Sequence, residues 1–500
     1  MRWKEFLGRR KPAGYFAEFN CACRCRHKVM SSSLGSDLFC GSEVHPQRRR
    51  TFVLVFFALV SCAIAIAVAC NVPLSFDGAF YFFSALDRQW FAIFHGRDID
   101  LLLQSPMIAA LNFTENAYLL RIAFCAGYAA VPLLCLWLCW LLCRKRHASL
   151  FIWPATAICL ATLPGQFSFV SESILAITLM WPALITVLVG GPWLLYALFS
   201  AGAVEAHVTA LIPLGVTVAV ACVGAIVHQQ ARRPLLTMAA IGVLLFIRRA
   251  TIPLDLYEHH MLGLHTIGYS FHVAVLGWPL VGVGFSWLAA LACLRSEHPT
   301  ARRVFIVSIV LSGIALILWA CNPSDWRRAA NYKYWVGPFS LIFMAAAAYE
   351  ALGVRPAEEP SLGIRFITLP VVGAIFLIVL AIQSVTWEKM SHRLTTDLVN
   401  SGHGCVSMDA LPWTAGTAMD HWSVSVYAAD LQGRQPAALL LPSENACRTF
   451  AETGDALLAS TPTWSHVRRS GEGWFDFSTA RKVALGGSST AEAAGPNSRP

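Results

Sequence analysis

Acidic, basic and histidine side chains stand in the short segments that separate the long apolar runs of this sequence. Asp77 follows the first run closely, in the segment Pro73–Gly78. A carboxylate at such a place can take the proton of a hydroxyl group that attacks a substrate. The other residues that could bind a substrate are charged or imidazole side chains between later runs: Glu172, Glu205, His207, Arg248, Arg249, Glu258, His259, Arg327, Arg328 and Lys333.

The elements that must position these residues are apolar helices. Of the 500 residues, 56% are hydrophobic and only 13% are charged, about half the charged fraction of an ordinary soluble domain. A helix that crosses a membrane needs about 20 mostly apolar residues. The runs of this kind are 51–70, 117–142, 148–164, 173–189, 192–204, 207–227, 235–250, 271–294, 304–321, 335–352 and 365–386. The sequence therefore predicts an all-α polytopic membrane protein.

The distribution of Lys and Arg predicts the orientation, because basic residues flank the cytoplasmic ends of spans. Basic brackets stand at 48–50, 144–147, 232–233, 295–303 and 355–365, so an even number of crossings separates each neighbouring pair. This gives about eleven spans, with the N-terminus cytoplasmic and the C-terminus outside, in a bacterial inner (plasma) membrane. Two spans and a re-entrant segment between residues 147 and 231 are the alternative to four spans there.

Two basic clusters oppose this orientation. Arg248–Arg249 and the cluster Arg327, Arg328 and Lys333 fall on the outer side, where Lys and Arg are under-represented. Guanidinium groups bind phosphate through paired hydrogen bonds, so we expect an anionic ligand at this face. The alternative is that these side chains reach lipid headgroups from helix ends.

Glu205 and His207 are ionisable residues inside a long apolar stretch. Such residues at membrane depth usually face a cavity or a partner, and we expect a cavity here. The alternative places both in a short, solvated external turn.

The chain divides into four regions. Residues 1–50 form a basic cytoplasmic tail that we expect to be disordered, and 51–386 form the transmembrane domain. In its first external loop, the aromatic stretch 78–94 predicts an interfacial helix lying against the membrane. Residues 387–483 form a small extracytoplasmic α/β module, and residues 484–500 are small and polar, as in a disordered tail.

With Asp77 just after the first span, an aromatic helix in a large external loop, a basic cluster at 327–333 and a soluble C-terminal region, residues 51–390 resemble the GT-C class of membrane glycosyltransferases. The resemblance implies a polyprenyl-phosphate sugar donor, a cell-envelope glycan, lipid or protein acceptor, and inverting transfer with Asp77 as the base. Arg327, Arg328 and Lys333 would hold the phosphate. Many members carry paired acids in this loop, whereas Gly78 follows Asp77.

Other functions stay open at this stage. An O-antigen ligase or polymerase also has many spans, and a multi-pass transporter or flippase of an anionic or lipid-linked envelope solute is the non-enzyme alternative. Members of the GT-C class often need a divalent ion, but the sequence contains no fixed ligand set, so we name no metal ligand. The net charge of +9 is explained by the cytoplasmic basic brackets and does not indicate nucleic acid; the expected partners, besides donor and acceptor, are membrane lipids.

Two further predictions concern single residues. Cys405 and Cys447 are the only cysteines in the external C-terminal region, and because that compartment is oxidising, we expect them to form a disulfide. Asp77 has an alternative role as the N-cap of a helix over 78–94, a position that Asp fills well.

Overall fold

The chain separates into two units, Met1–Ser42 and Glu43–Pro500. The computed structural model describes residues of the second unit only: 46–93, 97–145, 147–162, 170–207, 210–228, 242–243, 247, 251, 277–294, 298–326, 336–351, 359–419, 421–460, 465–469 and 473–493. The prediction for the cytoplasmic tail therefore falls almost entirely outside the described residues.

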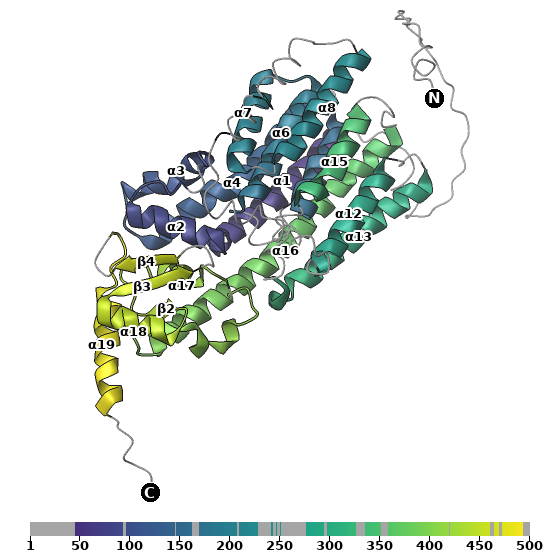
Figure 1. Ribbon diagram of the computed structural model, residues 1–500. Helices are drawn as coiled ribbons and strands as arrows, with labels where there is room; N and C mark the ends of the chain where they lie inside the picture. Colours follow the sequence, from purple (N-terminus) through teal and green to yellow (C-terminus); the bar gives the residue numbers. More distant parts are fainter. Residues whose placement is uncertain are drawn as a thin grey trace, which may run out of the picture. The chain divides into compact units, whose positions relative to one another are not determined.

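In the described part, helices form at the expected apolar runs (Figure 1). They are α1 (Pro46–Ala69), α4 (Ala117–Cys143), the continuous turns η3 (Ala148–Phe151), α5 (Ile152–Thr156) and η4 (Ala157–Thr162), then α6 (Glu172–Val189), α7 (Trp193–Ala206), α8 (Leu211–His228), α12 (Gly277–Cys293), α13 (Pro299–Ala320), α15 (Val336–Ala351) and α16 (Glu359–Asn400). The run expected at 235–250 lies almost entirely outside the described residues.

Five helices of the described part are long and apolar enough to cross a membrane. They are Gln47–Ala69, Ala117–Cys143, Glu172–Val189, Pro299–Ala320 and Gly363–Asn400. The other apolar helices are shorter, with 10–17 residues. Length and composition thus give a largely helical membrane protein, and the number of about eleven spans stays a prediction.

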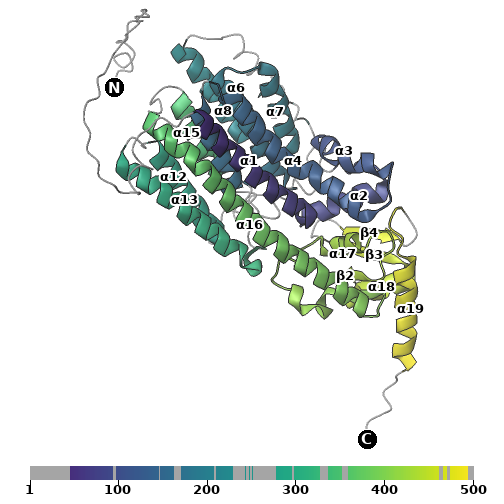
Figure 2. The ribbon, with the colours of Figure 1, turned by 180° about the vertical axis from the view of Figure 1, so that it is seen from behind.

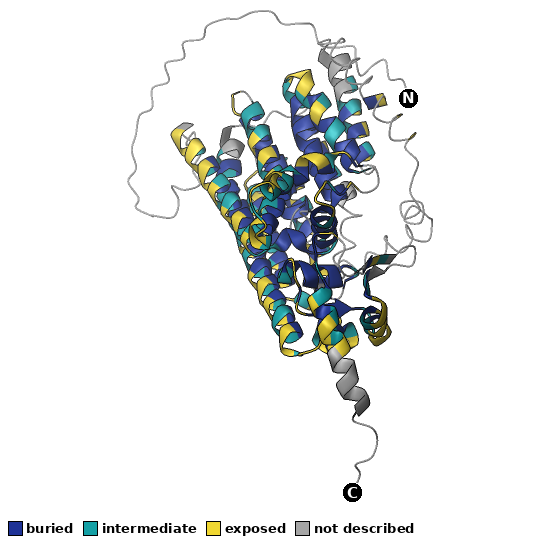
Figure 3. Ribbon diagram, turned by 90° about the vertical axis from the view of Figure 1, so that its left-hand side faces the viewer, coloured by how far each residue is buried: buried dark blue, intermediate teal, exposed yellow. Residues whose placement is uncertain are grey.

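The outer faces of these helices are apolar. Leu54, Trp137, Leu198, Val307 and Ile378 are all among the large hydrophobic residues exposed on the surface. Figure 3 shows that exposed residues follow the outer sides of the helices while buried residues fill the interior. Because so much exposed apolar surface is unfavourable in water, these faces fit a lipid environment.

Helix α1 packs along α16, and the two lie side by side in both ribbon views (Figures 1 and 2). Gly373 lets the two helices approach, since an added Cβ would meet the Phe56 and Leu59 side chains at 3.3 Å. Helix α12 pairs with α13, and α6 pairs with α7 and α8. Gly313 of α13 packs against Ile375 of α16. Helix α13 therefore contacts both α12 and α16.

At one end of the bundle, a buried ion pair joins three helices. Arg365, near the start of α16, donates to Glu350 of α15 at 2.6 Å and to the Cys293 carbonyl of α12 at 3.3 Å. The indole nitrogen of Trp153 donates to the same Glu350 oxygen at 2.9 Å. This end contains residues that the predicted orientation places on the cytoplasmic side.

Between α1 and α4 lie two helices, α2 (Asp77–Arg88) and α3 (Ile99–Leu111). The prediction of one helix over 78–94 that lies against lipid is wrong in both respects. Helix α2 ends at Arg88. Its aromatic residues are covered by protein: the ring centroids of Phe82 and Phe124 are 5.5 Å apart, and those of Phe83 and Phe475 are 4.4 Å apart. A helix with apolar residues on every side needs cover on every side, and a membrane surface covers one.

The sequence did not predict α3, which has an apolar outer face. Leu102 is 68% exposed, whereas Leu103 and Met107 are buried. Gly127 of α4 brings α3 close, because an added Cβ would lie 2.1 Å from the Leu103 carbonyl oxygen. Within this loop, α3 is therefore the helix whose exposed face fits a membrane surface.

The C-terminal region is a small α/β module, as expected. Two short parallel strands, β1 (Cys405–Ser407) and β2 (Leu439–Leu441), pair in register Cys405 with Leu439, and two antiparallel strands, β3 and β4, form a hairpin. The remaining elements are α17 (Val424–Gln432), α18 (Glu444–Thr453), β3 (Asp455–Ser460), β4 (Ser465–Arg469) and α19 (Ser478–Ala493).

Two boundaries of this module differ from the prediction. Helix α16 does not end at 386 but continues to Asn400, because Trp387, Leu394 and Leu398 on its inner face are buried. Residues 484–493, expected to be disordered, continue α19. The carboxylate of Asp476 accepts from the Ser478 amide at 2.9 Å, and a helix once started extends at low cost. Residues 494–500 lie outside the described residues.

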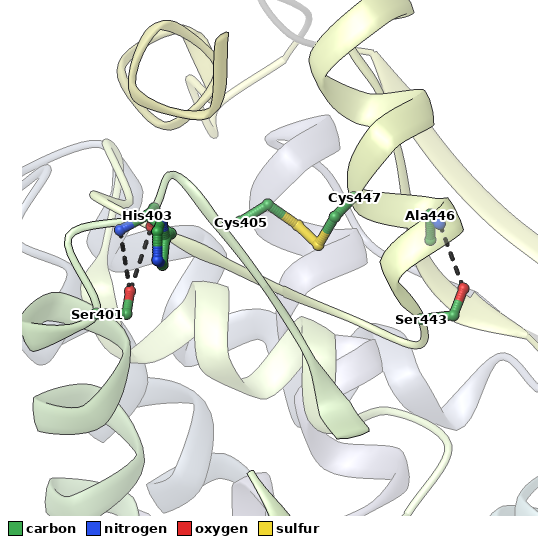
Figure 4. Close-up of a disulfide and its surroundings, with 6 residues drawn as sticks. All are labelled: Ser401, His403, Cys405, Ser443, Ala446 and Cys447. Atoms are coloured by element: carbon green, nitrogen blue, oxygen red, sulfur yellow. Dashed lines mark hydrogen bonds between the residues drawn. A yellow bond between two sulfur atoms is a disulfide. The ribbon is translucent and has the colours of Figure 1, made fainter. Parts of the chain in front are cut away.

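The pair of cysteines expected from the sequence is joined in the structure. Cys405 of β1 and Cys447 of α18 form a disulfide, with their Cα atoms 5.6 Å apart and 42 residues apart in sequence (Figure 4). The bond ties the first strand of the module to a helix whose N-cap, Ser443, accepts from the Ala446 amide at 3.2 Å.

We expect Cys447→Ser to destabilise the module by about 2–4 kcal/mol, because closing a loop of this length restricts the unfolded chain. Thermal unfolding of purified protein, with and without reductant, measures the effect. Reductant should lower the Tm of the wild type and leave that of the variant unchanged. Mass spectrometry of non-reduced protein that found two free thiols would contradict the disulfide itself.

Candidate active site

Polar side chains from four helices meet at the end of the bundle where α1 ends and α6 begins. Tyr81 of α2 lies within electrostatic range of Asp77, Arg97, Asp100 and Glu172. Asp100 in turn bonds to Tyr128 of α4. This cluster, completed by Gln104 of α3, is called here the loop cluster.

Asp77 is the first residue of α2, and an unusual backbone places it there. A short turn, η2 (Val72–Leu74), follows α1, and then Phe76 adopts φ 55° and ψ −118°. A bulky residue at positive φ is strained, at a cost of about 1–3 kcal/mol. Asp77 stands next in the first turn of α2, where the helix dipole favours a negative charge.

The alternative role of Asp77 as an N-cap is wrong. The N-cap position belongs to Phe76, which makes no side-chain cap hydrogen bond. The glycine after Asp77 accommodates a close approach of the chain itself. An added Cβ there would lie 1.9 Å from the Pro73 carbonyl oxygen.

Glu172, the first residue of α6, is the centre of the loop cluster. One of its carboxylate oxygens forms an ion pair with Arg97 and accepts a hydrogen bond from the hydroxyl group of Tyr81. The side chains of Arg97 and Glu172 are 5% and 10% exposed, so the two charges compensate each other away from water. Losing one partner of such a pair leaves a buried charge and costs about 3–5 kcal/mol.

Asp100 and Gln104 lie one turn apart on α3. Tyr128 donates to Asp100 at 3.0 Å, and the Gln104 amide donates to Tyr128 at 3.5 Å. Gln104 also forms two bonds with the backbone of Ala92, at 2.8 and 2.9 Å. This pairing fixes the segment between α2 and α3 against α4.

Burial determines the protonation states in the loop cluster. Burial and the negative charge of Glu172 raise the pKa of Asp100 to about 8. The second oxygen of Asp100 is buried without a hydrogen-bond partner, which suits a protonated carboxyl group better than a carboxylate. Burial and the negative charge of Glu172 also raise the pKa of Tyr81. Its hydroxyl group therefore stays protonated and is the donor of the hydrogen bond to Glu172.

We expect Asp100→Asn to raise the Tm of the protein more at pH 8 than at pH 5. Because the fold keeps a proton that the unfolded chain loses above the ordinary pKa of 3.8, Asp100 destabilises the fold increasingly as the pH rises from about 4 to about 8. Thermal unfolding in detergent measures the gap between variant and wild type. Asp98→Asn, an exposed acid beside it, is the control. A difference in Tm between Asp100→Asn and the wild type that does not grow with pH would contradict a protonated Asp100 in the folded protein.

Glu205 and His207 lie at the same end of the bundle. Helix α7 ends with Glu205 buried, 9% exposed, and His207 follows as its C-cap. One turn earlier, Gly202 faces Ile99 of α3 and Leu179 of α6, since an added Cβ would contact both at 3.6 Å. The end of α7 is therefore next to the start of α3.

The other substrate-binding residues expected from the sequence lie outside the described residues. They are Arg248, Arg249, Glu258, His259, Arg327, Arg328 and Lys333. The structure thus brings Asp77 and Glu172 into one cluster, places Glu205 and His207 at the same end, and leaves the basic residues unplaced. Among the described residues, no group of three His, Cys, Asp or Glu side chains could hold a metal ion.

Four members of the loop cluster had no role assigned from the sequence: Arg97, Asp100, Gln104 and Tyr128. A signal was present in Asp100 and Gln104, which stand four residues apart in an otherwise apolar stretch. Polar residues at such spacing share one face of a helix, and polar side chains in apolar helices usually have partners. The partners themselves are distant in sequence.

Compared with known proteins, the chain matches no protein-family model and no curated protein. The geometry of the loop cluster and of the helices around it is therefore the basis of the functional assignment.

Proposed function

We propose that the protein is an inverting membrane glycosyltransferase of the GT-C class, which moves a sugar from a polyprenyl-phosphate donor to a cell-envelope acceptor. The observation that carries the proposal is the place of Asp77. It begins a helix shortly after the first apolar helix, in a loop that holds two helices, beside the buried Arg97–Glu172 pair. The resemblance of the sequence to this class rests on the same place.

In the proposed reaction, Asp77 takes the proton of an acceptor hydroxyl group. The acceptor oxygen forms a bond to the anomeric carbon while the bond from that carbon to the phosphate oxygen breaks, and polyprenyl phosphate leaves with the electron pair. Attack opposite the leaving group inverts the anomeric centre, as in inverting hydrolysis. Positive charge must stabilise the leaving phosphate. Arg97 already compensates Glu172, so this role is proposed for Arg327, Arg328 and Lys333.

The loop cluster supports the reaction by holding Asp77 in place. Tyr81 stands one turn after Asp77 on α2 and is anchored to Glu172, so α2 cannot rotate freely. The aromatic residues of α2 next to Asp77 are buried, and in the proposed reaction they wall one side of the site, which strengthens electrostatic contacts there. Glu205, His207, Arg248, Arg249, Glu258 and His259 are proposed for contacts to the sugar, the acceptor or the phosphate.

The proposed setting is a bacterial inner membrane, with about eleven spans, a cytoplasmic N-terminus and an external C-terminal module. The ends of the described helices support it. Residues Cys293, Glu350 and Arg365, assigned to the cytoplasmic side, meet in one ion-pair cluster. Residues Asp77 and Glu172, assigned to the outer side, meet in the loop cluster.

Reporter fusions test this orientation. We expect fusions after His147 and after Ala410 to report opposite compartments, because the basic brackets hold the first site inside. A fusion after Glu297 serves as a control and should report the same compartment as His147. Equal signals at His147 and Ala410 would contradict the span count.

A donor assay tests the activity. Purified protein in lipid nanodiscs is given a panel of polyprenyl-phosphate hexoses and pentoses with an envelope extract as acceptor, and released polyprenyl phosphate is measured. We expect release with one donor class, and repeating the assay with Mg²⁺, Mn²⁺ or a chelator settles metal dependence. No release with any donor would contradict the proposal.

A transporter or flippase of an anionic or lipid-linked envelope solute is the second candidate. The buried Arg365–Glu350 pair favours it, because ionisable residues between apolar helices often line a transport path. Uptake of the solute by proteoliposomes without sugar transfer would support this candidate over the enzyme.

A further inference from the structure

The strained residue before Asp77 is held by the C-terminal module. Ser423, at the start of α17, donates a hydrogen bond from its hydroxyl group to the carbonyl oxygen of Phe76 at 2.6 Å. The ring of His421 stacks on the ring of Phe76, with centroids 4.7 Å apart. The sequence separation of about 350 residues means that this contact forms only when the module docks.

The donor and the acceptor of each hydrogen bond around Ser423 can be assigned. The single hydroxyl proton of Ser423 goes to the Phe76 carbonyl, so the contact between Ser423 and the Nδ1 atom of His421, at 3.0 Å, must have Nδ1–H as donor. His421 is buried, and burial lowers its pKa to about 3. The imidazole is therefore neutral, with its proton on Nδ1, and its second face lies toward Trp387 of α16, 6.4 Å away.

The module is docked along the whole length of α2, so Ser423 cannot drift away from Phe76. At the far end of α2, Arg468 contacts both oxygens of Asp87, at 2.7 and 3.0 Å, and the Trp474 amide donates to Asp87 at 3.1 Å. In the middle, Phe80 packs on Trp422 at 5.2 Å.

Further contacts join the module to α4 and to Glu115, two residues before that helix. Arg121 donates to the Asp430 carbonyl at 2.7 Å, and Arg434 forms an ion pair with Glu115 at 2.5 Å. The docking of the module therefore does not depend on Ser423.

We propose that Ser423 and His421 are positioning residues for Asp77, and that the C-terminal module completes the active site by holding Phe76 in its strained conformation. This inference rests on the proposed role of Asp77 as the base. Without the hydroxyl group of Ser423, the Phe76 carbonyl loses this hydrogen bond to the module and the positive φ can relax. Asp77, the next residue, then moves relative to the substrate.

Kinetics test the positioning role. Ser423→Ala should lower kcat by about 10–100-fold, the size expected for a small misplacement of a reacting group, with KM for the donor little changed. Ser423→Thr keeps the hydroxyl group and should restore most of kcat. His421→Asn keeps a donor near the Nδ1 position and should retain more activity than His421→Phe, which keeps only the ring.

A double-mutant cycle links the effect to the backbone of residue 76. Glycine tolerates positive φ, so in a Phe76→Gly background the conformation no longer depends on the module. Ser423→Ala should then cost less than in the wild type, and the difference is the coupling between the two residues. Equal costs in both backgrounds would overturn the proposal.

Hydrogen exchange provides a readout that needs no substrate. In Ser423→Ala, the amides of residues 74–80 should exchange faster than in the wild type and in Ser423→Thr, while those of α18 stay unchanged as an internal control. Unchanged exchange at 74–80 overturns the inference whatever the activity. Near-normal turnover by Asp77→Asn refutes the proposed function instead, whereas an inactive Asp77→Asn together with a fully active Ser423→Ala refutes only the positioning role.

Discussion

Asp77→Asn is expected to give a folded, inserted protein with sugar transfer reduced about 100-fold to 10,000-fold, the usual range for loss of a general base. The amide has nearly the same shape as the carboxylate but cannot accept the acceptor proton. Because Phe76 and not Asp77 holds the N-cap position, the substitution removes the favourable interaction of the carboxylate with the helix dipole but not a helix cap. That interaction is worth about 0.3–1 kcal/mol.

The measurement combines donor turnover with thermal unfolding of the same sample. Asp98→Asn is the matched control, since Asp98 is an exposed acid before α3 in the same loop, and it should keep normal turnover. Asp77→Asn with near-normal turnover would remove Asp77 from the reaction. A loss of activity that follows a loss of folded protein would give it a structural role only.

The second large effect is expected at the other end of the bundle, in stability. Arg365→Ala leaves Glu350 buried, with Trp153 as its remaining side-chain partner, and we expect a loss of about 3–5 kcal/mol. Replacing both partners should recover much of this loss, because the penalty comes from the unpaired charge. The double variant Arg365→Met with Glu350→Gln keeps an acceptor for the Trp153 indole, which donates to Glu350 in the wild type.

Thermal unfolding of purified protein in detergent measures this second effect. Arg434→Ala is the control, because the Arg434–Glu115 pair is 51% and 73% exposed and surface pairs contribute about 0–1 kcal/mol. Equal melting temperatures for Arg365→Ala and Arg434→Ala would contradict the expected cost. In the surviving folded fraction, normal sugar transfer identifies the pair as structural, and a loss of solute uptake identifies it as part of a transport path.

The helical ranges could be predicted from the sequence because an apolar run of sufficient length has one favourable structure in a membrane. The Cys405–Cys447 pairing could be predicted by exclusion, since no other cysteine lies in residues 387–500, the region expected to be external. Asp77 and Glu172 could be chosen as site candidates because each stands next to the end of an apolar run, and the structure brings both into the loop cluster.

The partners of these residues could not be predicted, because they depend on contacts between distant segments. Nothing near Arg97 in the sequence points to Glu172, and nothing near Phe83 points to Phe475. The aromatic stretch of α2 was assigned to a lipid surface since its composition fits either lipid or protein. Only the docked module decides between them. Helix α16 likewise continues past its apolar part because residues of the module bury Trp387.

Because α16 is continuous from Glu359 to Asn400, the thickness of the bilayer can affect the geometry of the site. At 1.5 Å per residue, its 42 residues reach about 63 Å, roughly twice the thickness of the hydrocarbon core. Long helices respond to thinner or thicker bilayers by tilting, and a tilt of such a rod displaces its outer end most. Trp387 lies in that outer part, against His421, which stacks on Phe76. The length of the lipid chains should therefore change the position of Asp77, the proposed base. The turnover rate should change with it, even where donor and acceptor are the same.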